Sequence, residues 1–521
     1  MAKKLRVVII KPSKYGLDGY VQRFRWGFMP NSTVPYIKSM TPAELRGTPV
    51  EVHTVDEYVH TDLDYLPLLK QEAGYTTLLA VVGVQSHQFH RALDLAAYAR
   101  RNGCLAVIGG PHPMTCDTSM LHGRGISFAL AEAELIWPII LSDALAGELQ
   151  PVYGEHQRWQ QKLEAPALIP PGREDLRRYV TPMLGLYPAR GCPFVCNYCS
   201  VIKIAGRAVR SQSIATTIAS LKAAKAAGVR MIMFTSDNFN KYAEAEALLN
   251  AMIEERINLN FFVQCDTQIS KQEGLVELLS RAGCFQMFLG VESFNRETLL
   301  AARKGQNRPE LYEDIVRLLR KYAISSHFST IIGFPQDAAE DIRQHIRILC
   351  ELDPTWASFY VLTPIPGTEQ YGDFLRDGLI TERNLDRFDT TCLTWRHPEF
   401  SRAQLDALLY DCYRKFYSFK HSLTNVRRLD FKKGGLLSET LISLGNSGFT
   451  RFSARKRTHP MAGGIKRVNL DRADDFLRLR REFFDFEFAP LPRILQLPEA
   501  DTALNRLATL APRSARVQSS V

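Results

Sequence analysis

The stretch Arg190-Gly191-Cys192-Pro193-Phe194-Val195-Cys196-Asn197-Tyr198-Cys199 decides how this chain is interpreted. Its three cysteines fall within eight residues, so their thiolates can converge on one metal centre. Thiolate is the soft ligand that favours iron–sulfur clusters and zinc. No further Cys or His follows at close spacing, and three protein ligands leave one coordination position open, which is typical of a catalytic metal. The alternatives are a zinc loop completed from elsewhere and three unrelated buried cysteines.

The length and composition indicate a globular protein of several domains. A chain of 521 residues is too long for one hydrophobic core, so two or three domains are expected. The apolar run after Met1 is too short for a secretory signal, and no apolar stretch is long enough to cross a bilayer. We therefore expect a cytoplasmic, reducing location, in which the ten cysteines do not form a disulfide framework.

The net charge of +10 is unevenly distributed along the chain. A concentrated basic stretch contains Arg451, Arg455, Lys456, Arg457, Lys466 and Arg467. Such a patch can hold an anionic substrate, nucleic acid or lipid head groups, and a solvated surface is the common alternative. No nucleic-acid-binding module accompanies it, so no nucleic-acid partner is predicted.

Residues 1–150 predict a Rossmann-like domain. Short β-branched runs alternate with helical periodicity, a pattern typical of a parallel sheet that is buried on both faces. Ligands of open α/β sheets bind at the carboxyl ends of the strands. The residues that follow two of these predicted strand ends are Gly83, Ser86, Gly109, Gly110 and His112.

The rest of the chain divides into three further parts. Residues 151–182 are rich in Pro, Gln and charge and predict a linker. In residues 183–385, six predicted strands with crossover helices indicate a partial (β/α)6 barrel. Residues 386–521 predict a mainly helical region that closes the open side of the barrel, with a closing helix near 471–486 and a poorly ordered tail after about residue 500. The predicted fold class is therefore α/β.

Polar residues recur where the predicted barrel strands end, which is the functional edge of such barrels. Asp237 follows the second strand, and Gly290-Val291-Glu292-Ser293 follows the fourth. Gln264 and Asp266 follow the third strand. A carboxylate such as Asp237 can accept a charge-assisted hydrogen bond from an ammonium group, or it can cap a helix N-terminus.

The spacing C-x3-C-x2-C, with the aromatic Tyr198 before the third cysteine, resembles the signature of the radical S-adenosylmethionine (SAM) superfamily. This resemblance implies that Cys192, Cys196 and Cys199 hold a [4Fe–4S] cluster whose fourth iron binds SAM. It also implies a SAM site made of the strand-end residues, with Asp237 facing the SAM ammonium. In the same way it implies an electron donor such as flavodoxin or ferredoxin. The residues assigned to SAM on this basis are Tyr198, Asp237, Gln264, Asp266, Glu292 and Ser293.

The N-terminal domain resembles the cobalamin-binding domain that precedes the radical SAM core in the anaerobic magnesium-protoporphyrin ester cyclases and the hopanoid methylases. The resemblance implies a cobalamin site at Gly83, Ser86, Gly109, Gly110 and His112. Two departures are evident. The cobalt-ligating motif Asp-x-His-x-x-Gly is absent, and Ala131 stands where the family motif Gly-Glu-x-Glu begins. A Rossmann-like scaffold that binds no cobalamin is the alternative.

The combined pattern predicts a radical SAM enzyme that functionalises an unactivated carbon of a small-molecule or lipid substrate. The leading hypothesis is cobalamin-dependent methyl transfer. The second is a cobalamin-free radical SAM enzyme that catalyses cyclisation, coupling or rearrangement. The third, from another class, is a non-enzymatic iron–sulfur or zinc protein.

Overall fold

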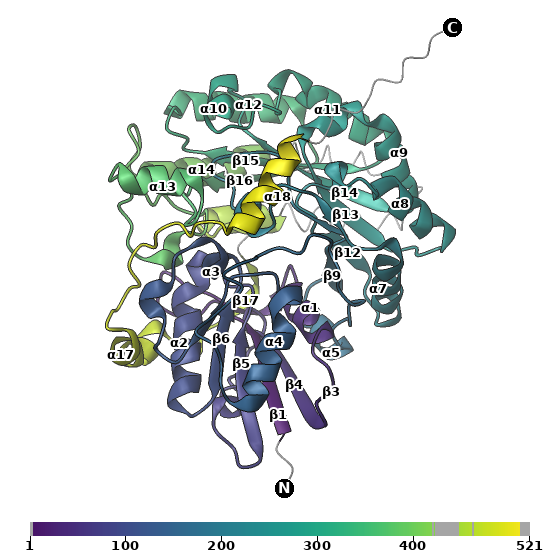
Figure 1. Ribbon diagram of the computed structural model, residues 1–521. Helices are drawn as coiled ribbons and strands as arrows, with labels where there is room; N and C mark the ends of the chain where they lie inside the picture. Colours follow the sequence, from purple (N-terminus) through teal and green to yellow (C-terminus); the bar gives the residue numbers. More distant parts are fainter. Residues whose placement is uncertain (1–3, 419–420, 422–447, 461–462, 511–521) are drawn as a thin grey trace.

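A computed structural model describes residues 4–418, 421, 448–460 and 463–510. The N-terminal sheet with its helices forms one layered unit, and a second sheet lies beyond it, surrounded by helices (Figure 1). The predicted α/β class is confirmed. Within the described residues, no helix is both long enough and apolar enough to span a membrane. All ten cysteines are free thiols, as expected.

The first sheet has seven strands in the order β3-β4-β1-β5-β6-β7-β8. All neighbouring strands are parallel except β3 and β4. The strand bounds are β1 Lys4–Lys11, β3 Glu44–Leu45, β4 Thr48–Asp56, β5 Tyr75–Val81, β6 Leu105–Gly109, β7 Ser127–Ala129 and β8 Val152–Tyr153. Helix α2 (Phe89–Arg101) packs on one face and α4 (Ala133–Ala146) on the other. Strand β1 is therefore buried on both faces, which explains its continuous apolar run.

The second sheet has six strands in the order β16-β15-β14-β13-β12-β9, all parallel. The strand bounds are β9 Met183–Leu186, β12 Met231–Phe234, β13 Asn260–Cys265, β14 Cys284–Glu292, β15 Ser325–Ile332 and β16 Trp356–Val361. Crossover helices cover its outer face: α7 Ile214–Ala226, α8 Ala245–Glu254, α9 Glu273–Ala282, α11 Tyr312–Lys321 and α12 Ala339–Leu352. Such a sheet brings all its strand ends to one edge, where the polar residues lie.

The C-terminal region departs from the sequence prediction. Helix α14 (Arg402–Phe416) begins after the N-cap Ser401 and packs against β16. Helix α17 (Ala473–Phe484), however, packs on α2 of the N-terminal unit instead of closing the barrel. The predicted loose tail is also wrong as far as residue 510, because helix α18 (Glu499–Leu510) follows and Asp501 is buried. Long-range contacts, which local periodicity does not encode, decide both placements.

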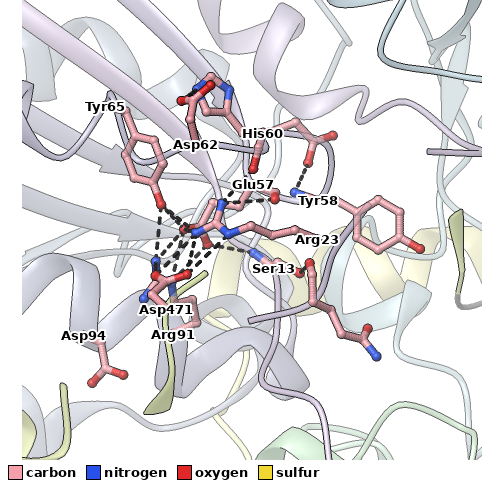
Figure 2. A network of polar contacts seen from close by, with 12 residues as sticks. Ser13, Arg23, Glu57, Tyr58, His60, Asp62, Tyr65, Arg91, Asp94 and Asp471 are labelled. Carbon is pink, nitrogen blue, oxygen red and sulfur yellow. Dashed lines mark hydrogen bonds and ion pairs between the residues drawn. The ribbon is translucent and has the colours of Figure 1, made fainter. Parts of the chain in front are cut away.

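Buried ion pairs fasten this C-terminal segment to the N-terminal unit (Figure 2). Glu57 accepts hydrogen bonds from Arg91 Nη2 at 2.7 Å and Arg23 Nη2 at 3.0 Å, and Asp471 contacts both arginines. The side chains of these four residues are at most 6% exposed. A buried charge without its partner is strongly destabilising, so the network requires the C-terminal segment to stay docked.

Candidate active site

Backbone hydrogen bonds and a neighbouring helix hold the cysteine loop in place between strands β9 and β11 (Arg210–Ser211). Cys192 N donates to Gly206 O at 3.1 Å, and Cys199 N donates to Cys196 O at 3.2 Å. Asn197 N donates to Ala302 O at 3.2 Å, just beyond α10 (Arg296–Ala301). The loop is thus fixed by the protein before any cofactor is considered.

The three thiols present the donor set of an iron–sulfur cluster. Burial raises the pKa of Cys192 to about 11 and that of Cys199 to about 12, so thiolates are expected only when a metal stabilises them. Among the residues that the structure describes, the only three metal-ligand atoms within 4.8 Å of one another belong to His60, Asp62 and Asp64. At least one separation between two of the three cysteine sulfurs therefore exceeds 4.8 Å. Ligands of a single zinc ion lie about 3.8 Å apart, so the arrangement suits a larger, multinuclear cluster.

Asp237, just beyond β12, binds the cysteine loop. Its Oδ2 accepts a hydrogen bond from Gly191 N at 2.8 Å, directly before the first cysteine. Burial raises the pKa of Asp237 to about 6. The next helical turn, residues 239–241, has Asn238 as its N-cap, so the alternative capping role is not used. The assignment of Asp237 to the SAM ammonium stays a prediction.

Glu292 and Lys304 form an ion pair at the end of β14. Lys304 Nζ lies 2.7 Å from Glu292 Oε1, and both side chains are about one-tenth exposed. An added Cβ at Gly290 would lie 2.6 Å from that Glu292 oxygen and 2.9 Å from Lys304 Nζ, so a larger residue there would displace the pair. Burial raises the pKa of Tyr198, and the adjacent Glu292 carboxylate raises it further. The Lys304 ammonium lies 5.9 Å from the centre of the Tyr198 ring, so the three side chains form one polar cluster at this strand end.

The other predicted SAM residues divide by their contacts. Asp266 accepts hydrogen bonds from Asn238 Nδ2 at 2.8 Å and from Gln268 N at 2.7 Å, so it fixes Asn238 near the cysteines. The Ser293 hydroxyl accepts from Asn295 N at 3.1 Å in a local turn. Gln264 is half-buried on β13, and within the described residues its side-chain amide makes no hydrogen bond. Of these three, Gln264 alone presents an uncommitted polar group.

Two amide side chains that the sequence analysis did not assign approach the cysteines. Asn238 Nδ2 lies 4.0 Å from Cys192 Sγ, and Gln306 Nε2 lies 3.7 Å from Cys196 Sγ. Hydrogen bonds to cluster sulfurs tune the potential of an iron–sulfur centre. The sequence could have indicated both residues only through their places in the chain, because Asn238 follows Asp237 and Gln306 lies two residues after Lys304.

The predicted cobalamin loops mainly contact each other. Val84 N donates to Gly109 O at 3.0 Å, and a Cβ added at Gly110 (φ +134°) would lie 2.1 Å from Val84 N. Ser86 Oγ and His112 Nδ1 are 2.9 Å apart, and both residues are at most 5% exposed. Burial lowers the pKa of His112 to about 3, so the ring is neutral. These contacts fix the shape of the two loops. Gly83 also has a partner outside the two loops, because Lys11 Nζ donates a hydrogen bond to its carbonyl oxygen.

Two carboxylates of the N-terminal unit form ion pairs with Arg190, the arginine that precedes the cysteine loop. Arg190 Nη1 lies 3.2 Å from Glu132 Oε1, and Arg190 Nη2 lies 2.9 Å from Glu134 Oε1. Arg210 Nη1 donates to Glu132 Oε2 at 2.7 Å. Tyr36 OH donates to Glu134 Oε1 at 2.7 Å, and the Arg190 guanidinium stacks on that ring at 5.0 Å. The Glu-x-Glu pair thus joins the two sheets at the first cysteine.

Comparison with known proteins matches this site to one family. The model of the radical SAM superfamily matches residues 186–349, which include all three cysteines and the Glu292 strand end. Residues 186–349 are therefore a radical SAM domain. Such a domain implies a [4Fe–4S] cluster and SAM, and the three thiols are a fitting donor set for the cluster. When bound, these cofactors generate a 5′-deoxyadenosyl radical.

Two relatives and one solved structure cover most of the chain. Bacteriochlorophyllide d C-12(1)-methyltransferase of Chlorobaculum tepidum is 27% identical over 60% of this chain and 68% of its own length. The C-8(2)-methyltransferase of the same organism is 25% identical over 75% of this chain and 87% of its own. The structure of the radical enzyme OxsB with aqua-cobalamin and SAM bound aligns with a TM-score of 0.58 at 13% identity, covering 92% of this chain and 79% of OxsB. OxsB therefore shares the fold.

Proposed function

We propose that this radical SAM protein is a cobalamin-dependent methyltransferase that acts on an unactivated carbon of a small-molecule or lipid substrate. The observation that carries the proposal is the Glu132–Arg190–Glu134 contact, which seats the carboxyl edge of a Rossmann-like sheet against the cysteine loop. A ligand at that edge would lie next to the barrel mouth. The names of the two relatives, both carbon methyltransferases, support the same chemistry.

Two titratable side chains at the edge of the N-terminal sheet are weakly solvated. Burial lowers the pKa of Lys11 to about 8 and that of His87 to about 3, because desolvation disfavours the charged form of each group. In our proposal the cofactor lies at this sheet edge, beside the barrel. The loops at Gly83 and Gly109–Gly110 would then carry it through their shape and backbone.

Within the barrel, we assign the residues by their contacts. Cys192, Cys196 and Cys199 hold the cluster, and Asn238 and Gln306 donate to its sulfurs. The SAM-facing group consists of Tyr198, Asp237, Gln264, Glu292 and Lys304. In this assignment Asp266 and Ser293 position neighbours, because their side chains hold Asn238, Gln268 and Asn295 in place. The protein must also receive an electron from a donor such as flavodoxin or ferredoxin.

Anaerobic reconstitution with iron, sulfide and hydroxocobalamin tests the proposal. We expect the wild type to bind about four irons and one cobalamin per chain, measured by iron assay and absorption spectra. The triple variant with Cys192, Cys196 and Cys199 changed to Ala should lose the iron and keep the cobalamin. Cys350→Ala, which changes an exposed cysteine, should retain both. Iron-loaded wild type that takes up no cobalamin would refute methyl transfer and favour cobalamin-free cyclisation, coupling or rearrangement.

A further inference from the structure

Large apolar side chains are exposed together where the C-terminal segment returns to the N-terminal unit. Strand β17 (Gly464–Val468) pairs antiparallel with β2 (Arg23–Gly27), and Ile465 lies directly opposite Trp26. Trp26 is 37% exposed, Ile465 41% and Phe452 61%. Leu17 and Met29, close to β2 in sequence, are 83% and 44% exposed. Exposed hydrophobic groups that cluster in this way mark interaction sites.

Ring contacts join the helical residues 448–455 to this ribbon. The rings of Phe28 and Phe449 meet edge to face with centroids 4.9 Å apart. Phe452 follows Phe449 by three residues, so both side chains lie on one side of the helix. The helix therefore lies against the ribbon of β2 and β17. We call the exposed side chains of residues 23–29, 448–457 and 464–468 the basic apolar patch.

The cations of the patch are mostly free of acidic partners. Arg457 lies 3.9 Å from Asp406, and Arg467 lies 2.7 Å from Asp18. Within the described part of the chain, no ion pair neutralises Arg25, Arg451, Arg455, Lys456 or Lys466. The Arg25 guanidinium lies 5.0 Å from the Trp26 ring, and the Lys456 ammonium 5.8 Å from the Phe452 ring. Within the patch, cationic side chains thus lie next to exposed aromatic rings.

We propose that the basic apolar patch binds the protein peripherally to an anionic membrane surface. Unpaired cations are attracted to anionic head groups, while aromatic and aliphatic side chains enter the boundary between head groups and acyl chains. An acidic protein or nucleic acid would satisfy the charges, but it would leave the aliphatic Leu17, Met29 and Ile465 without an apolar partner. The combination favours a lipid surface.

Short segments connect the patch to the barrel. Residues 28–32 run from β2 to Ser32, which contacts Gly185 of β9. His459, just after the helix, stacks on Tyr360 of β16 with centroids 5.4 Å apart. A substrate dissolved in the membrane would therefore lie near the active site. This consequence rests on the proposed function, whereas membrane binding itself does not.

Vesicle co-sedimentation of the full chain tests the proposal. We expect binding to phosphatidylcholine vesicles that contain phosphatidylglycerol, little binding to phosphatidylcholine alone, and weaker binding at high salt. Lys456→Glu combined with Lys466→Glu should weaken binding by at least about tenfold. Phe452→Ser should weaken it at low and high salt alike, because its contribution is apolar. The matched controls Lys271→Glu and Ile139→Ser change exposed residues elsewhere and should bind like the wild type.

Several outcomes would overturn the proposal. These are absence of binding to anionic vesicles, equal loss in Lys271→Glu, and wild-type binding by Phe452→Ser. Displacement of the protein from vesicles by trace single-stranded DNA would instead assign the patch to nucleic acid. Iron and cobalamin content should be unchanged in every patch variant, so a failed membrane test leaves the proposed function untouched.

Discussion

Replacing Arg190 with Met should uncouple the N-terminal sheet from the cysteine loop. Arg190 contacts Glu132 at 3.2 Å and Glu134 at 2.9 Å, and the three side chains are 14%, 5% and 3% exposed. Met has a similar length but no charge, so both carboxylates lose one partner. Glu132 keeps Arg210 Nη1 at 2.7 Å. Glu134 keeps only the hydroxyl of Tyr36, and its Oε2 is already buried without a partner.

The size of the effect follows from this asymmetry. Leaving one buried charge uncompensated typically costs about 3–5 kcal/mol. We assign most of that cost to Glu134, because Glu132 remains paired. Glu134→Gln in the Arg190→Met background removes the stranded charge and should recover about 2 kcal/mol, a coupling of the size that contacting residues show.

The assay must resolve the interface, since a chain with two sheets need not unfold in one step. Native-state hydrogen exchange of residues 33–39 and 189–192 reports local opening on both sides of the contact. The electron paramagnetic resonance spectrum of the reduced cluster gives a second readout, because Arg190 lies two residues before Cys192. Arg376→Met is the matched control. It breaks the surface ion pair between Arg376, whose side chain is 69% exposed, and Asp373, and it should cost less than about 1 kcal/mol of stability.

Two results would refute this reasoning. One is an Arg190→Met variant whose interface exchanges no faster than that of Arg376→Met. The other is a double variant with Glu134→Gln that shows no recovery. Either would mean that the contact is a passive consequence of docking, and that the cysteine loop is positioned by its own backbone hydrogen bonds alone.

Three further predictions follow. Glu292→Gln should keep its iron but bind SAM about ten- to a hundredfold more weakly in calorimetry, because a charge-assisted hydrogen bond contributes about 1.5–3 kcal/mol; unchanged affinity would exclude the residue from the SAM site. Gly110→Ala should lower the melting temperature, because its Cβ would lie 2.1 Å from Val84 N, whereas Gly274→Ala, with no atom within 4 Å, should not. Burial lowers the pKa of His327 in the folded state to about 4, whereas the ring of the unfolded chain takes up a proton below pH 6.5. Between these two pH values acidification should therefore lower the free energy of unfolding by about 1.4 kcal/mol per pH unit. In urea unfolding, the free energy of unfolding of His327→Gln should fall less steeply with decreasing pH than that of the wild type.

The sequence predicted the parts of the fold that are written in local patterns. Runs such as Leu5 to Ile10 identified parallel strands buried on both faces, and the cysteine spacing identified the radical SAM domain. The contacts of Asp237, of Ser86 with His112, and of α17 with α2 join residues that are far apart in the chain. No periodicity encodes such pairings. The sequence therefore located the site but did not distinguish residues that face the cofactor from residues that hold the loops.

Ala131 illustrates how a departure from a family motif can leave the neighbouring contacts intact. Its Cβ occupies the space where a Cβ added at Gly154 would lie, at a separation of 2.3 Å. The methyl group that Ala131 adds is thus accommodated because position 154 has none. The following Glu132 and Glu134 keep their places and both reach Arg190. The substitution weakened the resemblance when the motif was considered alone, yet the two glutamates of the motif both contact Arg190 of the second sheet's unit.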